Sequence, residues 1–91
     1  MSVTAMVSIQ VEDYAKWKAA FDGAAQMRTN MGIAIKGIYQ SAEDEKSVTI
    51  ISEYPSREVA EGIMANPAWE ENQRKSGVIG GFDTKFFHSV N

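Results

Sequence analysis

The segment VEDYAKWKAAFDGAAQMRTNMG, from Val11 to Gly32, carries the clearest structural pattern of the sequence. Its apolar side chains recur three or four residues apart, so they fall on one stripe of a helix. The stripe consists of Tyr14, Trp17, Phe21, Ala24 and Met31. Asp13 is suited to cap the first turn, and Gly32 is suited to end the last one. The pattern therefore predicts one long amphipathic helix.

Arg28 lies within this apolar stripe, between Phe21 and Met31 in projection. A guanidinium directed toward a core needs an anionic or carbonyl partner, because burying an unpaired charge is costly. Two interpretations stay open. In the first, Arg28 extends its head to solvent at the helix edge or pairs with a structural carboxylate. In the second, it faces a pocket and meets the negative charge or carbonyl oxygen of a ligand.

Length and composition restrict the class of protein. With 91 residues, the chain is expected to form one domain, 1–91, with a core that needs no disulfide or metal. The absence of cysteine agrees with a cytoplasmic protein. No segment approaches the roughly 20 apolar residues of a membrane span, and the net charge is −3 without a basic cluster. Neither a membrane nor a nucleic acid is therefore an expected partner.

The segments around the helix read as strands. Residues 3–11 alternate between apolar and polar side chains, and the odd positions should meet the helix. Residues 33–41 form a second predicted strand, in which Gly37 is a candidate bulge. The charged run at 42–46 separates it from a third predicted strand at 47–54, which indicates a hairpin.

The second half of the chain returns to a helical period. Ser56 can cap a helix, and Asn66-Pro67 interrupts it and restarts a shorter helical segment through about Ser76. Residues 77–81, GVIGG, are expected to form a mobile loop because three glycines frame two apolar side chains. Residues 82–90 form the predicted closing strand.

The order strand, helix, two strands, helix, strand is that of the ferredoxin-like βαββαβ fold, an α+β architecture. Right-handed crossovers place both helical regions on one face of a four-stranded antiparallel sheet. The other face is expected to carry apolar side chains as well, from Met6, Ile38, Ile51 and Phe87. Because an exposed apolar patch of that kind usually marks an interface, a homodimer with sheets packed face to face is expected.

Candidate functional side chains have alternative structural roles. His88 is the single histidine, and is either a surface or dimer-interface residue or a general base. Glu53 is either exposed, paired with a cation, or catalytic. Apolar and aromatic residues either fill the core or line a substrate pocket: Trp17, Phe21, Met31, Tyr39, Met64 and Trp69.

Several chemistries lack their motifs. One histidine cannot build a histidine-rich metal site, and GVIGG is not a phosphate-binding loop because it leads into a strand. No GxSxG context or cysteine provides a nucleophile. The sequence therefore predicts no metal and no organic cofactor.

Four stretches together resemble the dimeric α/β-barrel superfamily, particularly its small members similar to antibiotic-biosynthesis monooxygenases. They are DYAKWKAAFD with the following MR and G at 13–32, GIYQSAEDEKSVTIISEY at 37–54, ANPAWEENQRKSGV at 65–78 and the closing aromatic strand. The superfamily includes cofactor-free oxygenases, haem-degrading and isomerising enzymes, and members with no assigned reaction. Similar short members often carry a histidine four residues before the arginine. This chain has Ala24 there, so the resemblance carries over Arg28 but no histidine.

Two functions are compatible with these observations. One is an enzyme that handles a small aromatic or enolisable molecule without a cofactor, with Arg28 stabilising the developing anion and Trp69 and Tyr39 positioning the ring. The other is a dimeric binding or structural protein with a filled core. A continuous cavity beside Arg28 would favour the enzyme, and an internal carboxylate partner for Arg28 would favour the second class.

Overall fold

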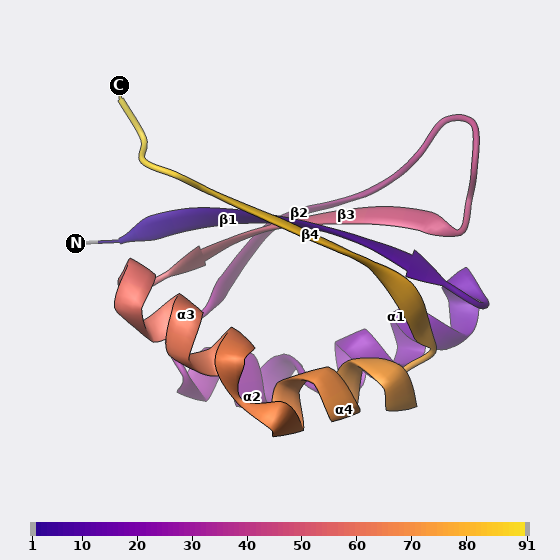
Figure 1. Ribbon diagram of the computed structural model, residues 1–91, viewed down its shortest axis with the longest axis horizontal. Coiled ribbons are helices and arrows are strands. Elements are labelled where there is room, and N and C mark those ends of the chain that lie inside the picture. The colour runs from indigo at the N-terminus through magenta and orange to yellow at the C-terminus, as the bar shows by residue number, and fades with distance from the viewer. Residues whose placement is uncertain (1, 91) are drawn as a thin grey trace.

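In the computed structural model, which describes residues 2–90, one antiparallel sheet with strand order β2-β3-β1-β4 carries the helices on a single face (Figure 1). Along the chain the elements are β1 (Val3–Val11), α1 (Tyr14–Gly23), α2 (Ala25–Asn30), β2 (Ala34–Gln40), β3 (Ser47–Tyr54), α3 (Arg57–Ala65), α4 (Pro67–Lys75) and β4 (Val78–Phe87). The predicted ferredoxin-like fold is confirmed. Each predicted helical region consists of two consecutive helices.

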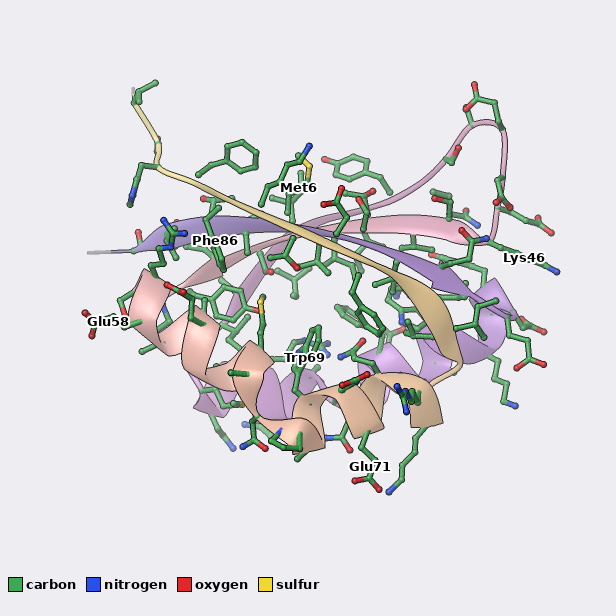
Figure 2. The ribbon with its side chains drawn as sticks, viewed as in Figure 1. Met6, Lys46, Glu58, Trp69, Glu71 and Phe86 are labelled. Carbon is green, nitrogen blue, oxygen red and sulfur yellow. The ribbon has the colours of Figure 1, made fainter. Side chains whose placement is uncertain are left out.

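The core lies between the sheet and the helices, and the two central strands supply most of it. Odd residues of β1 and even residues of β3 are buried, as the period of two requires. Trp17 on α1 is 1% exposed and Ala60 on α3 is fully buried, so both helical regions contribute to the same core. The side chains of opposite parity form a second face without helices, called the open face here. In Figure 2, Met6 projects from it.

The single long helix predicted over 11–32 is wrong, because the chain breaks at Ala24 into α1 and α2. Ala24 leaves helical geometry at φ −95° and ψ 9°. It follows Gly23, a residue that weakens a helix interior by about 1 kcal/mol relative to alanine. The break redirects α2, so Met31 is 40% exposed and does not continue the buried stripe.

The predicted ends of this helical region are confirmed. The Asp13 carboxylate accepts a hydrogen bond from the Lys16 N–H at 3.1 Å. Gly32 has φ +79°, and the Ile33 N–H donates to the Arg28 carbonyl at 2.9 Å. This Schellman-type ending fixes the backbone immediately beside Arg28 and turns the chain into β2.

A bulge in β2 decides which side chains face the helices. The register against β3 shifts between Ile35 and Gly37, so Lys36 is the extra residue and a bulge lies next to Gly37, where the sequence suggests one. Because of the extra residue, Ile35 and Ile38 both pack against the core, so the expected placement of Ile38 on the open face is wrong. Tyr39 is on the open face instead and is 56% exposed.

The boundaries in the second half follow the predicted cap at Ser56 and the predicted interruption at Asn66-Pro67. The Ser56 hydroxyl accepts from the Val59 N–H at 3.1 Å, and the Asn66 side chain caps α4 through the Ala68 N–H at 2.9 Å. Residues 77–81 are not a loop, because β4 begins at Val78 and pairs with β1 through an irregular register. Gly81, at φ +77°, accommodates this irregularity: a Cβ there would lie 3.1 Å from the Gln10 nitrogen.

Candidate functional site

A cavity of about 510 Å³ lies beside this core, between the helices and part of the sheet. The sheet side is mainly apolar and includes Val7, Ile35 and Ile50. The helix side includes Phe21, Arg28 and Trp69, and Figure 2 shows Trp69 projecting from α4 toward the sheet. This volume lies within the range of pockets that bind drug-sized molecules.

Arg28 supplies the positive charge of this cavity. Its guanidinium carbon lies 3.7 Å from the centroid of the Phe21 ring, which is a cation–π contact. Within residues 2–90 its side chain makes no hydrogen bond or ion pair, and the neighbouring Asp22 carboxylate is bound by Lys18 at 2.7 Å. Partial burial lowers the pKa of Arg28, while Asp22 and Tyr54 oppose this effect. An arginine remains cationic at neutral pH, so the cavity holds a charge without an anionic partner.

Two hydroxyl groups from β3 lie on the sheet side of the cavity. Ser52 is 3% exposed and Tyr54 is 7% exposed. Burial raises the pKa of Tyr54, against the opposing effects of the Ser52 hydroxyl and of Arg28. The phenol therefore keeps its proton at neutral pH and can donate it to a ligand oxygen.

The sequence contained a signal for these two residues that the initial interpretation did not use. Ser52 and Tyr54 share the parity of Val48 and Ile50, the clearest core positions of β3. A polar side chain at a core position needs a partner, so it indicates either an internal hydrogen bond or a ligand. Asn66, Asn72 and Gln73 also line the cavity, but a helical surface position gave no comparable signal.

The structure brings together only part of the predicted site. Phe21, Arg28, Met31 and Trp69 line the cavity. Trp17 instead lines a smaller neighbouring recess, and Met64 packs against the core cluster.

Three other predicted site residues lie away from the cavity. Tyr39 and Glu53 are on the open face, because of the β2 bulge and the parity of β3 respectively. His88 follows the last residue of β4 and is exposed, so its expected place within the closing strand is wrong. Arg28 therefore does not share a site with Glu53 or His88.

The pKa of Tyr54 predicts a pH dependence of stability. Folding favours the neutral phenol, so its contribution is complete below the unfolded-state pKa of about 10 and is lost as pH rises through the higher folded-state pKa. Tyr54→Phe should cost a roughly constant amount below pH 10, on the order of 1 kcal/mol for the lost polar interactions of the phenol. Because the variant lacks this phenol, its free energy of unfolding should fall less than that of the parent between about pH 8 and pH 11.

The measurement is urea unfolding of parent and variant at both pH values. Tyr39→Phe is the matched control, since Tyr39 is exposed on the open face. An identical loss in the parent and in Tyr54→Phe would contradict a raised pKa at this position.

Within residues 2–90, the carboxylates and the histidine form no group of three that could hold a metal ion. No helix in the same range is long and apolar enough to cross a membrane.

Solved structures with the same fold were found, although no family model and no curated protein sequence matches the chain. A protein from Bordetella bronchiseptica titled "Putative antibiotic biosynthesis monooxygenase" superposes with a TM-score of 0.75 at 13% identity, covering 99% of this chain and 98% of that one. SnoaB, a cofactor-independent oxygenase from Streptomyces nogalater, gives a TM-score of 0.69 at 12% identity, with 99% and 94% covered. A conserved protein from Methanosarcina mazei Go1 gives 0.71 at 12% identity, also with 99% and 94% covered. The resemblance inferred from the sequence is confirmed as a likeness of fold to antibiotic-biosynthesis-monooxygenase-like proteins.

Proposed function

We propose that the protein binds a small aromatic or enolisable molecule in the cavity beside Arg28 and oxygenates it without a cofactor. The observation that carries this proposal is a cation without an anionic partner at the wall of a mainly apolar cavity. An enolate or phenolate oxygen would supply that partner, and Tyr54 offers a second hydrogen-bond donor. The likeness of fold to a cofactor-independent oxygenase adds support.

The reaction proposed for such an anion needs only dioxygen as oxidant. Loss of a proton from a CH₂ group beside a carbonyl gives an enolate, whose negative oxygen binds Arg28. Its carbon then gives up electrons to dioxygen and forms a C–O bond, and reprotonation yields a hydroperoxide. Loss of water from the hydroperoxide leaves a new carbonyl, so that R₂CH₂ and O₂ become R₂CO and H₂O. The protein contributes orientation, charge stabilisation and exclusion of bulk water.

The residues that line the cavity indicate that the substrate must ionise readily by itself. Glu58 is the carboxylate among the lining residues, and Figure 2 shows it projecting outward from α3, away from the cavity. Among the described residues, no side chain that points into the cavity can therefore act as a strong base. This favours substrates that ionise readily in water, such as a 1,3-diketone or a hydroxyaryl ketone, over simple ketones.

We further propose that the partner of the open face is a second copy of the chain. The centre of this face carries Ile51 paired with Met6 across adjacent strands, and Phe87 and Tyr39 lie nearer its edges. Phe87 is 44% exposed and Tyr39 is 56% exposed. The β2–β3 loop and the C-terminal residues both rise on this side of the sheet (Figure 1). A second sheet packed between them would bury these apolar side chains.

The proposed activity predicts two separate signals from the purified protein. A panel of aromatic 1,3-diketones and hydroxyaryl ketones should quench the fluorescence of the two tryptophans, since Trp69 lines the cavity. Ligands that bind should also consume dioxygen in a closed electrode chamber at a rate proportional to protein concentration. Arg28→Met provides the control for both signals. Binding without oxygen consumption would assign the protein to non-catalytic binding, and absence of both signals would contradict the proposal.

A further inference from the structure

A second, smaller recess opens on the other side of Arg28, between α1 and α4. It has a volume of about 240 Å³ and is bounded by Trp17 and Ala20 on α1 and by Lys75 on α4. Four residues line both this recess and the large cavity: Phe21, Arg28, Asn72 and Gln73. The two spaces therefore adjoin at these residues, so a ligand that reached past Arg28 from the first would enter the second.

The recess differs from the large cavity in its chemistry. Arg28 supplies a positive charge, Lys75 lies at the rim, and the lining includes no carboxylate. The Lys75 ammonium contacts Glu71 at 3.3 Å, and Figure 2 shows Glu71 projecting from α4 away from the sheet. Both side chains of this pair are mostly exposed, so the pair is weak and Lys75 can turn toward an anion in the recess. The local field of the recess therefore favours an anion.

The side chains of Asn72 and Gln73 strengthen this preference. Neither side-chain amide makes a hydrogen bond within residues 2–90, although both residues belong to α4, whose backbone is ordered by its own hydrogen bonds. In contrast, the Ser76 hydroxyl already has partners, since it donates to the backbone carbonyl oxygens of Asn72 and Gln73 at 3.0 and 2.9 Å. Two uncommitted amide groups next to two cations can supply the donors that a carboxylate accepts.

We infer that the recess between α1 and α4 is a subsite for an anionic arm of the ligand, with a carboxylate as the arm of best size and charge. The inference rests on the proposed function, because the large cavity has to hold the aromatic body of the same molecule. Arg28 then lies between the two parts of the ligand. The amides of Asn72 and Gln73 and the ammonium of Lys75 bind the arm.

The test uses naphthalene-2-acetate and its methyl ester, which share an aromatic body and differ in charge. Isothermal titration calorimetry should show the acid binding the parent about tenfold more tightly than the ester. Ala20→Leu fills the recess from α1 with a good helix-forming residue and does not line the large cavity. It should lower the affinity of the acid to that of the ester and leave the ester unchanged.

A second pair of variants separates the charge of the recess from the total charge. Lys75→Met should weaken the acid several-fold at low ionic strength. Arg74→Met removes the same charge from the neighbouring position, which pairs with Glu70 at 2.7 Å and lies outside the recess, so it should have little effect. Equal binding of acid and ester by the parent, or equal weakening of both by Ala20→Leu, would overturn the subsite alone. Failure of both probes to bind would overturn the proposed function and the subsite with it.

Discussion

Arg28→Met is expected to weaken the binding of a phenolate or enolate ligand by about 10- to 100-fold, the equivalent of losing a charge-assisted hydrogen bond worth about 1.5–3 kcal/mol. The free protein should lose little stability, because no internal anion is left behind. The cation–π contact with Phe21 disappears, at a cost of about 0.5–2 kcal/mol. Methionine keeps much of the volume of the stem and can contact the same ring, and the desolvation of the guanidinium is relieved. Stability should therefore change by no more than about 1 kcal/mol in either direction.

The measurements are a fluorescence titration and a urea unfolding curve for each protein. Lys18→Met is the matched control: it removes a cation from α1 by the same substitution, but Lys18 pairs with Asp22 and lies outside the cavity lining. Its binding should equal that of the parent. A loss of several kcal/mol in Arg28→Met, with no ligand bound by the parent, would show instead that Arg28 serves the fold and that the cavity has no ligand.

The fold was largely predictable because each element carries its own local signal. The predicted strand at 47–54 coincides with β3, and the predicted cap residues Asp13 and Ser56 both form capping hydrogen bonds. The sequence revealed the bulge in β2 but not the break at Ala24 or the irregular pairing of β4. The break at Ala24 follows Gly23, and the apolar periodicity that predicts the helix does not register a single helix-weakening position.

The site was less predictable because it depends on which face each side chain occupies. Arg28 could be singled out because a charge within an apolar stripe is visible in the sequence, and the structure places it among the residues that line the cavity. Tyr39 and Glu53 were grouped with it by residue type, whereas the β2 bulge and the β3 parity direct both to the open face. Ser52 and Tyr54 were missed for the opposite reason: their parity was known, but their chemistry was not considered.

Ile51→Glu should convert the proposed dimer to monomer, and it should have the largest effect of the substitutions considered. Ile51 lies near the centre of the open face, opposite Met6 on β1 and Gly37 on β2. In a dimer with twofold symmetry each interface contains two copies of the new carboxylate, both near the axis or facing apolar surface. At about 2–3 kcal/mol for each desolvated, unpaired charge, the penalty is about 4–6 kcal/mol, which raises the dimer dissociation constant by roughly 10³- to 10⁴-fold.

Light scattering at micromolar concentration measures the result directly, and the parent should have the mass of two chains. Ile51→Val should remain dimeric, because it shortens the side chain without adding charge. Ala19→Glu should also remain dimeric, since it adds the same charge to the exposed surface of α1, on the helix side of the sheet. A monomeric parent would contradict the proposal outright. If the parent is a dimer but Ile51→Glu leaves its mass unchanged, then the two copies meet through a surface other than the open face.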